Sequence, residues 1–542
     1  MCKIKLSNVL KYYGDRKILN IDNLEVNENE KIGIVGKNGS GKTTLLKIIA
    51  GDIDWDKGKV EVIGSISFIK QLDNIEENKV NILSGGEKIL DIINEKISND
   101  SNILLADEPS TNLDIFNIDY VIKRLQEYKG IVLLISHDRN VLDQICTSII
   151  EIEGGEVKKY KGNYSSYKKQ KELENERKKF EYKNYIKEKE KLERAVIKSR
   201  EGAKTMKKAP KRMGNSEARL HKREASEIKE KLEGQSKALK TRIEKLEVKQ
   251  KPKGDYSIYL KPPTNEILKN KIVIKSDNLN LKIGEKTLIK DSKLYIYTNK
   301  INGLIGKNGS GKTTLIKQIV KGNKDIYINP SLEISYFRQN LDNLNPEKSI
   351  RENVMKDSIQ SQTTVRNILG NLNIKDDDIY KLVKDLSGGE KVKISLAKVI
   401  LSDANFLILD EPTNFLDIQS IEGLEKMLKA YKGTVLLVSH DKKFLDDVVD
   451  NIIIIKNKKI IQYDGNYSKY LDEIQDKNKK RSESKNKNNF INKEYTRNTN
   501  DKLLLEFQIT KLESEIAVTS DKDEKERLIK LLNDISNNYQ KM

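Results

Sequence analysis

The stretch KIGIVGKNGSGKTT, residues 31–44, decides the fold. Residues 31–35 form a short apolar run that predicts a buried strand, and the apolar residues 45–50 that follow the loop predict a helix. The glycines between them let backbone N–H groups turn inward on a phosphate, so a strand, a Gly-rich loop and a helix in this order indicate a phosphate-binding loop. The same nine letters, GKNGSGKTT, return at residues 306–314.

Each loop supplies the groups that a bound triphosphate needs. Lys42 and Lys312 are expected to reach the terminal phosphates, and the hydroxyls of Thr43 and Thr313 to hold Mg²⁺. The residues predicted to bind nucleotide in the two loops are Gly36, Asn38, Gly39, Gly41, Lys42, Thr43 and Thr44, and Gly306, Asn308, Gly309, Gly311, Lys312, Thr313 and Thr314.

Three further motifs follow both loops in the same order. LSGGEK occupies residues 83–88 and 386–391, Asp-Glu-Pro residues 107–109 and 410–412, and Ser-His-Asp residues 136–138 and 439–441. The chain has three histidines, and two of them stand at these equivalent Ser-His-Asp positions. A lone histidine is more often a core residue, but this matched placing favours a functional role. The chain therefore contains an internal duplication.

The order of the motifs GxxxxGKT, Gln, LSGGE, DEP and SHD resembles the ATP-binding cassette. Two cassettes in one chain without membrane helices resemble the ABC-F family, and the resemblance covers nearly the whole chain. It implies an α/β fold in which two ABC-type P-loop ATPase domains are joined by a long antiparallel α-helical linker. It also implies ATPase activity with ATP and Mg²⁺, in which the LSGGE of one cassette caps the ATP held by the phosphate loop of the other.

Site roles follow from the resemblance, position by position. The residues implied in hydrolysis are Glu108 and Glu411, which polarise the attacking water, His137 and His440, which sense the γ-phosphate, and Gln71 and Gln339. The residues implied in holding Mg²⁺ are Thr43, Gln71, Asp107, Thr313, Gln339 and Asp410. The signature residues implied in capping the nucleotide are Ser84, Gly85, Gly86, Ser387, Gly388 and Gly389, whose hydroxyl and N–H groups can donate to a γ-phosphate.

The two cassettes differ in length. From the loop lysine to the Asp-Glu-Pro aspartate there are 65 positions in the first (42 to 107) and 98 in the second (312 to 410). The deficit of 33 lies between the glutamine and the signature serine, with 13 positions (71 to 84) against 48 (339 to 387), and two extra positions between the lysine and the glutamine of the first cassette partly offset it. The first cassette is therefore expected to have lost most of its helical subdomain, a feature that resembles the antibiotic-resistance members of the family.

An aromatic residue distinguishes the first nucleotide site. Tyr13 stands where the family stacks an aromatic ring on adenine, and the matching position in the second cassette is Ile283. The second site is therefore expected to hold adenine less tightly, although both sites keep their glutamate and histidine and are expected to hydrolyse ATP.

The segment between the cassettes is charged and almost free of proline. Apolar residues recur at steps of three, four or seven on its C-terminal side, namely Ala225, Ile228, Leu232, Leu239, Ile243 and Leu246, which predicts a helix packed along another helix. We expect two antiparallel helices joined near residues 207–216. The tip, residues 203–224, carries eight basic and two acidic side chains, which suits a phosphate backbone, although a solvated loop on a coiled coil explains the charge as well.

Composition limits the classes of partner. The chain has 542 residues and a net charge of +19, which points to a polyanionic partner or to solubility alone. Cys2 and Cys146 are too few for a disulfide framework and fit a reducing cytosol. No apolar run reaches the ~20 residues of a membrane helix, so a cytoplasmic protein is expected.

The predicted boundaries are 1–164 and 270–472 for the cassettes, 165–260 for the linker, 473–500 for a basic flexible segment and 501–542 for a C-terminal helical hairpin.

The resemblance implies a partner and a task. ABC-F proteins bind the 70S ribosome at the tRNA exit site, and their linker reaches toward 23S rRNA and the P-site tRNA. The tip resembles that of Vga/Lsa-type resistance proteins, which implies protection from pleuromutilins, lincosamides and streptogramin A by a monomer whose two domains pair. The expected tip contacts are Lys207, Lys208, Lys211, Arg212, Met213, Asn215 and Arg219. A general translation factor and the ATPase subunit of a drug exporter stay open as alternatives, as does the role of the hairpin.

Overall fold

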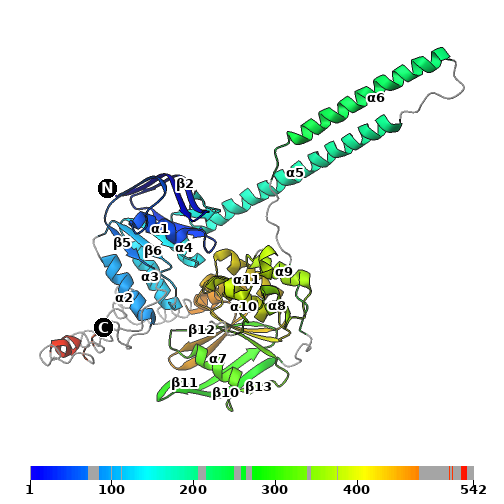
Figure 1. Ribbon diagram of the computed structural model, residues 1–542. Coiled ribbons are helices and arrows are strands. Elements are labelled where there is room, and N and C mark those ends of the chain that lie inside the picture. Colours follow the sequence, from blue (N-terminus) through cyan, green and yellow to red (C-terminus); the bar gives the residue numbers. More distant parts are fainter. Residues whose placement is uncertain are drawn as a thin grey trace, which may run out of the picture.

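The computed structural model describes residues 2–70, 85–98, 101–111, 113–205, 215–249, 258–263, 271–338, 343–374, 376–474, 512, 516 and 527–533. Two α/β lobes lie against each other, and a long pair of helices projects from them (Figure 1). This arrangement confirms the predicted fold class of two P-loop domains joined by a helical insertion.

The first lobe is built on a nine-stranded sheet. Its elements are β1 (Lys3–Tyr13), β2 (Arg16–Asn27), β3 (Lys31–Gly36), α1 (Lys42–Ala50), β4 (Lys57–Ile63), β5 (Ile66–Ile69), α2 (Gly85–Ser98), β6 (Ile103–Asp107), α3 (Ile115–Glu127), β7 (Ile131–Ile135), α4 (Arg139–Ile145), β8 (Ser148–Glu153) and β9 (Glu156–Lys161). The strand order is β4-β1-β2-β9-β8-β3-β7-β6-β5. Strands β8, β3, β7, β6 and β5 are parallel, whereas β1 pairs antiparallel with β2 and β4.

The parallel strands bring three motifs to one edge of this sheet. Strands β6 and β7 are buried at every residue, because helices cover both faces of a parallel sheet. Ligand sites of open α/β sheets form at the carboxyl ends of such strands. Here the phosphate loop follows β3, the Asp-Glu-Pro motif closes β6, and Ser-His-Asp follows β7.

The second lobe repeats this plan with two sheets. Its elements are β10 (Ile272–Ile283), β11 (Lys286–Tyr297), β12 (Ile301–Gly306), α7 (Lys312–Lys321), β13 (Tyr327–Ile328), β14 (Ile334–Phe337), α8 (Ile350–Met355), α9 (Gln362–Asn371), the 3-10 turns Asp376–Tyr380 and Val383–Asp385, α10 (Gly388–Leu401), β15 (Phe406–Asp410), α11 (Ile418–Ala430), β16 (Thr434–Val438), α12 (Lys442–Val448), β17 (Asn451–Lys456) and β18 (Lys459–Asp464). The strand orders are β14-β15-β16-β12-β17-β18 and β11-β10-β13.

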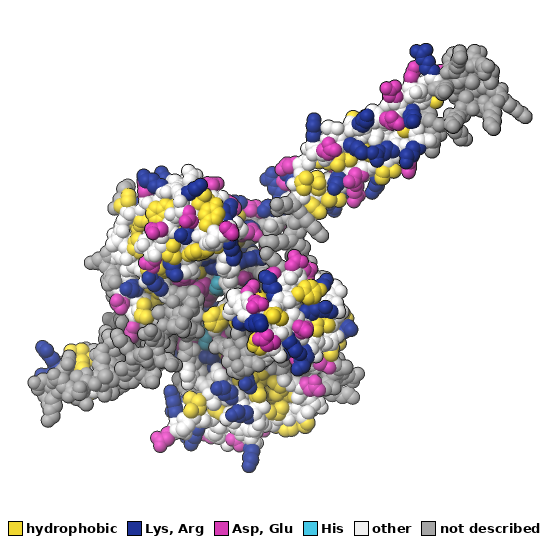
Figure 2. Space-filling model, viewed as in Figure 1, with side chains coloured by type: hydrophobic (Ala, Val, Ile, Leu, Met, Phe, Trp, Pro, Cys, Tyr) yellow, Lys and Arg dark blue, Asp and Glu magenta, His cyan; other side chains and the backbone are white. Residues whose placement is uncertain are grey.

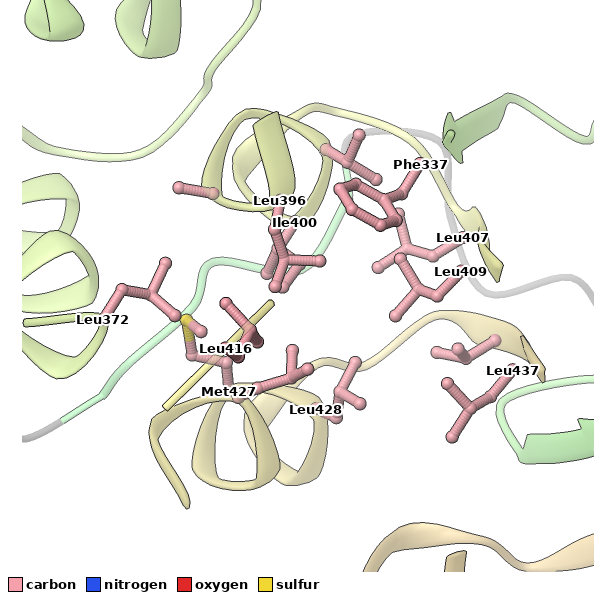
Figure 3. Close-up of a cluster of buried hydrophobic side chains, with 14 of the residues drawn as sticks. Phe337, Leu372, Leu396, Ile400, Leu407, Leu409, Leu416, Met427, Leu428 and Leu437 are labelled. Atoms are coloured by element: carbon pink, nitrogen blue, oxygen red, sulfur yellow. The ribbon is translucent and has the colours of Figure 1, made fainter. Parts of the chain in front are cut away.

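The lobes differ in the segment that leads to the strand ending at the Asp-Glu-Pro aspartate. Between β14 and β15 the second lobe holds α8, α9, two 3-10 turns and α10. Between β5 and β6 the described residues of the first lobe hold α2 alone. The helices between β14 and β15 share a packed core with the sheet of the second lobe, in which Leu396 and Ile400 of α10 face Phe337, Leu407 and side chains of α11 (Figure 3).

The linker forms two long helices that lie side by side, α5 (Tyr164–Thr205) and α6 (Asn215–Glu244). At 1.5 Å per residue, α5 is roughly 60 Å long. Leu192, Val196 and Ala203 are buried along α5 at steps of four and seven, and the Ser199 hydroxyl donates to the Leu232 carbonyl over 2.8 Å. Acidic and basic side chains are mixed along the solvent faces of both helices (Figure 2).

One residue of the predicted helix–helix seam is exposed to solvent. Ile228 is 46% exposed, whereas Leu232 and Leu239 are half-buried against α5. The step from Ala225 to Ile228 follows the helical period, but the crossing of the two helices decides which positions are covered. The tip residues Lys207, Lys208, Lys211, Arg212 and Met213 lie outside the described residues, and Asn215 and Arg219 are placed only as part of α6. Of the predicted C-terminal hairpin, only a helix at residues 527–533 and two single residues are described.

The base of α5 is anchored in the first lobe by a buried carboxylate. Glu151 of β8 accepts hydrogen bonds from the hydroxyls of Tyr160 (3.2 Å) and Tyr167 (2.8 Å) and an ion pair from Lys171 (2.6 Å). A buried carboxylate is stable only when several donors surround it, so these contacts hold the helix base rigidly to the sheet.

Candidate functional site

The two phosphate loops share one backbone geometry. In the first, Gly39 (φ 72°) and Gly41 (φ 102°) adopt left-handed conformations, and a Cβ at Gly41 would lie 2.9 Å from Ile18. The Lys42 ammonium donates to the carbonyls of Gly36 (2.9 Å) and Lys37 (3.1 Å), bent back along its own loop.

The second loop repeats this geometry, with Gly309 at φ 71° and Gly311 at φ 103°. The Lys312 ammonium donates to the carbonyls of Gly306 (2.8 Å) and Lys307 (3.3 Å). A triphosphate would replace these carbonyls as the partner of the lysine, since a charged acceptor binds an ammonium more strongly.

A glutamate and a histidine lie together at each site. Glu108 and Glu411 have φ angles of 52° and 51°, a conformation that costs on the order of 1–3 kcal/mol for a residue with a Cβ and that clusters at functional sites. The Nε2 atom of His137 lies 3.5 Å from Oε1 of Glu108, and that of His440 lies 3.2 Å from Oε1 of Glu411.

Burial favours the uncharged form of the glutamate and of the histidine at each site. It raises the pKa of both Glu108 and Glu411 to about 8 and lowers the pKa of both His137 and His440 to about 3. Burial also lowers the pKa of the Lys42 ammonium, against the attraction of Glu108. Each histidine is therefore neutral near pH 7, and each glutamate has a pKa in the range that suits a general base.

The structure brings the signature of the second cassette to the loop of the first. A Cβ at Gly389 would lie 3.4 Å from Nδ2 of Asn38, and that Nδ2 donates to the Phe415 carbonyl over 3.0 Å. In the reciprocal contact, the backbone N–H of Asn308 donates to Asp114 Oδ2 over 3.0 Å. The phosphate loop of each cassette is therefore in contact with the other cassette.

Side chains from both cassettes line a cavity of about 720 Å³ between the lobes, a size that accommodates a nucleotide. The predicted site residues that line it are Tyr13, Asn38, Gly39, Gly41, Lys42, Thr43, Thr44, Asp107, Glu108, His137, Asn308, Gly389, Glu411 and His440. The hydroxyls of Ser40 and Ser310, one in each loop, are buried and have no hydrogen-bond partner among the described residues. A phosphate oxygen would satisfy such a donor.

The predicted signature serine makes a different contact from the expected one. The Ser387 hydroxyl donates to Glu390 over 2.6 Å in a capping box at the start of α10, so it would reach a phosphate only after leaving Glu390. Ser84 lies outside the described residues, and Gly85 and Gly86 are placed only as the first residues of α2. Gln71 and Gln339 also lie outside the described residues.

The oxygen ligands present fit Mg²⁺. Thr313 Oγ1 donates to Asp410 Oδ2 over 3.2 Å, and Thr43 and Asp107 line the cavity at the first site. Among the described residues, no three His, Cys, Asp or Glu side chains gather as a metal cluster. Mg²⁺ is commonly held by one or two protein oxygens together with substrate phosphates and water, so this sparse set suits it.

Several residues at the site were not predicted from the sequence. Arg16 donates to the Gly39 carbonyl over 3.4 Å and lines the cavity beside Tyr13. Asp114 reaches the opposite loop, whereas its counterpart Asp417 is paired with Lys393 over 2.9 Å. The two aspartates close the repeated segments DEPSTNLD and DEPTNFLD, a duplication that could have identified them.

Sequence comparison agrees with this geometry. A family profile described as ABC transporter matches residues 19–71 and 289–414, and a second with the same description matches residues 150–233. The fold and site thus define an ABC-type ATPase. No helix in the described part of the chain is long and apolar enough to cross a membrane.

Proteins of similar sequence indicate the family within this class of ATPases. The chain is 36% identical to the erythromycin resistance ATP-binding protein MsrA of Staphylococcus epidermidis, over 82% of this chain and 96% of that protein. It is 31% identical to the ribosome protection protein VmlR of Bacillus subtilis (84% and 87%) and 32% identical to the ATP-binding protein Uup of Buchnera aphidicola (82% and 79%). The chain belongs to the ABC-F family of ATPases.

Solved structures show the same fold. The RNase-L inhibitor aligns with a TM-score of 0.55 at 19% identity, covering 83% of this chain and 87% of that one. A ribosome-bound archaeal Pelota and ABCE1 assembly aligns with a TM-score of 0.53 at 19% identity, covering 84% and 78%. At this identity the likeness concerns the fold.

Proposed function

We propose that the protein binds ribosomes in its ATP-bound, closed form and protects them from antibiotics that act at the peptidyl transferase centre. The observation that carries this proposal is the contact between Gly389 and Asn38, which joins the signature of one cassette to the phosphate loop of the other. ATP bound there would hold the lobes together, and a helical arm far longer than packing requires leaves the same pair of lobes. ATP thus acts as a ligand that favours one conformation.

Each residue of the paired sites has a role in this proposal. Lys42 and Lys312 bind the terminal phosphates, and Glu108 and Glu411 orient the attacking water and take up its proton. His137 and His440, neutral at pH 7, hydrogen-bond the γ-phosphate. Thr43, Asp107, Thr313 and Asp410 would hold Mg²⁺ together with Gln71 and Gln339, and the bound ion would neutralise negative charge on the phosphate oxygens.

The arm is attached to both lobes, so closure would move it. Lys168 near the start of α5 pairs with Glu422 of α11 over 2.7 Å. At the exit, the backbone N–H of Lys261 donates to Gln360 Oε1 (2.8 Å), and Gln360 Nε2 donates to the Lys261 carbonyl (3.0 Å). Leu260 is buried in the core of the second lobe beside this contact. A change in the angle between the lobes would therefore change the direction of the arm.

The names of the relatives support a ribosomal task. MsrA is named for erythromycin resistance and VmlR for ribosome protection. For this chain we propose the tRNA exit site of the 70S ribosome as the binding site, with the tip near 23S rRNA and the P-site tRNA, in the cytoplasm and as a monomer. We further propose the Vga/Lsa branch and its drugs, pleuromutilins, lincosamides and streptogramin A.

A translation assay with purified components tests the proposal. The E108Q/E411Q double variant with ATP should cosediment with ribosomes, and the wild-type protein should restore translation in the presence of a drug of these classes. Deletion of residues 205–216 should leave ATPase activity intact and abolish the rescue. Absence of cosedimentation, or an equal rescue by the deleted protein, would contradict the proposal.

The two alternative functions give other outcomes. A general translation factor would change translation rates equally with and without drug. An exporter subunit would protect intact cells but not a membrane-free translation reaction. Rescue in the membrane-free reaction with drug alone favours ribosome protection over both.

A further inference from the structure

The two ATP sites differ at one hydroxyl beside the predicted Mg²⁺-binding aspartate. Tyr336 of β14 donates its hydroxyl to Asp410 Oδ2 over 3.4 Å. Thr313 donates to the same oxygen over 3.2 Å. Two donors on one oxygen restrict rotation of the carboxylate and direct the other oxygen away from them.

The first site has a phenylalanine at the equivalent place. Phe68 pairs with Leu105 in the parallel register of β5 and β6, just as Tyr336 pairs with Ile408 in that of β14 and β15. Each ring therefore stands at the same height relative to the aspartate that closes the neighbouring strand. Because phenylalanine has no hydroxyl, Asp107 cannot receive this hydrogen bond.

A cationic side chain lies over each of the two rings, Tyr336 and Phe68. The Arg338 guanidinium is 4.8 Å from the centroid of Tyr336, and the Lys70 ammonium is 5.6 Å from that of Phe68. Both rings are half-buried. Each ring thus has a cation over it, and the hydroxyl is the chemical difference between the rings themselves.

We infer that Tyr336 is a positioning residue that orients Asp410 for the metal, so that the second site needs less Mg²⁺ than the first to bind ATP. Groups that hydrogen-bond a metal-binding carboxylate typically change metal affinity by about 10–100-fold, and a 3.4 Å contact belongs at or below the lower end. This inference depends on the ATPase sites and their metal, and it holds whether or not the protein protects ribosomes.

Binding of a fluorescent ATP analogue at fixed nucleotide and varied free Mg²⁺ tests it. Lys42→Ala leaves the second site able to bind, and Lys312→Ala leaves the first. In the Lys42→Ala protein, Tyr336→Phe should raise the half-saturating Mg²⁺ concentration about 3- to 10-fold and leave binding in EDTA unchanged. In the Lys312→Ala protein, Phe68→Tyr should lower the half-saturating Mg²⁺ concentration.

The reciprocal exchange separates positioning from packing. If Tyr336 had a purely structural role, Tyr336→Phe would weaken nucleotide binding equally with Mg²⁺ and with EDTA, and that result would overturn the inference. An unchanged Mg²⁺ dependence in both exchanged proteins would also overturn it. Nucleotide binding that ignores Mg²⁺ in the parent proteins would overturn the metal assignment and this inference with it. Thermal unfolding of each variant checks that it is folded.

Discussion

At the scale of single residues, burial sets the chemistry of each ATP site. Glu411 lies at a strained backbone angle beside His440, and its carboxylate has no hydrogen bond to Oε1 among the described residues. Such a group costs stability in the nucleotide-free protein, because an ionised carboxylate loses its hydration on burial. The site is thus arranged for a ligand that supplies the missing partners.

Replacing Glu411 with Gln should stabilise the nucleotide-free protein, and the gain should grow as the pH rises from 5 to 8. Burial raises the pKa of Glu411 to about 8, so in this range the unfolded chain releases a proton that the folded protein retains. The free energy of unfolding of the wild type therefore falls with rising pH, and the gain from the amide should reach on the order of 3 kcal/mol at pH 8. Calorimetric unfolding at both pH values measures it.

Glu285→Gln is the matched control, because Glu285 is exposed on the turn after β10. It should leave the unfolding temperature unchanged at both pH values. A gain in the Glu411→Gln protein that is the same at pH 5 and pH 8 would contradict the role given to carboxylate burial.

Tyr13 should give the first site a higher affinity for ATP than the second. It is 51% exposed and lines the cavity, while Ile283 at the matching position offers no aromatic face. Stacking of a base on an aromatic ring contributes about 1–3 kcal/mol, so Tyr13→Ala in a Lys312→Ala protein should raise the dissociation constant for ATP about tenfold. Ile283→Tyr in a Lys42→Ala protein should lower it. Fluorescence titration measures both, and Tyr12→Ala, which alters an aromatic residue outside the cavity, should change nothing.

At the scale of secondary-structure elements, the arm depends on how its two ends are held. The start of α5 is fixed to the first lobe by Tyr167 and Lys171, which both contact the buried Glu151, and the chain that follows α6 is fixed to the second lobe by Gln360. Gln360 precedes α9, one of the helices that lie between β14 and β15 of the second lobe. Between β5 and β6, the described residues of the first lobe hold α2 alone, with no counterpart of α9.

Replacing Gln360 with Ala should loosen the exit of the arm without unfolding the second lobe. Two hydrogen bonds to the backbone of Lys261 are lost, each worth about 1 kcal/mol. Amide exchange at Lys261 should accelerate about 10- to 30-fold, because its N–H loses its acceptor. Hydrogen exchange followed by mass spectrometry measures this. Gln362→Ala, at the exposed first position of α9, serves as the control and should leave exchange at Lys261 unchanged.

At the scale of the whole molecule, two ion pairs that join the lobes differ in how deeply they are buried. Arg139, 4% exposed at the start of α4, pairs with Glu425 and lies 4.0 Å from Asp447. Its counterpart Lys442 pairs with Asp119, whose side chain is 46% exposed. Breaking a buried pair leaves a charge without compensation, whereas an exposed pair contributes little.

Arg139→Met should therefore weaken lobe pairing by about 3–5 kcal/mol, against at most about 1 kcal/mol for Lys442→Met. The ATP-dependent decrease in the radius of gyration, measured by X-ray scattering, should shift to higher ATP concentration in the first variant and much less in the second. Adding Glu425→Leu to Arg139→Met should recover part of the loss, because the unpaired carboxylate is removed. Equal effects of the two single variants would show that burial does not set the strength of these pairs.

Local sequence patterns predict much of the site. The Gly-rich loops, the two glutamates and the two histidines belong to short motifs whose geometry is set by neighbouring residues, so their spacing along the chain is enough to place them. The pairing of Lys393 is not predictable in this way, because its partner Asp417 lies 24 positions away and the first cassette has Leu90 at the equivalent place. The prediction for Ile228 is wrong for a related reason, since the helical period does not say which face the partner helix covers.

What the sequence alone determined is the number of cassettes, their chemistry, the shortened first subdomain and the helical arm, because spacing and periodicity are local properties of the chain. What only the tertiary structure decided is the pairing across the lobes: Asn38 with Phe415, 377 positions apart, Asn308 with Asp114, and Arg139 with Glu425. The physical reason is that these contacts depend on the relative orientation of two separately folded lobes. No local pattern encodes that orientation.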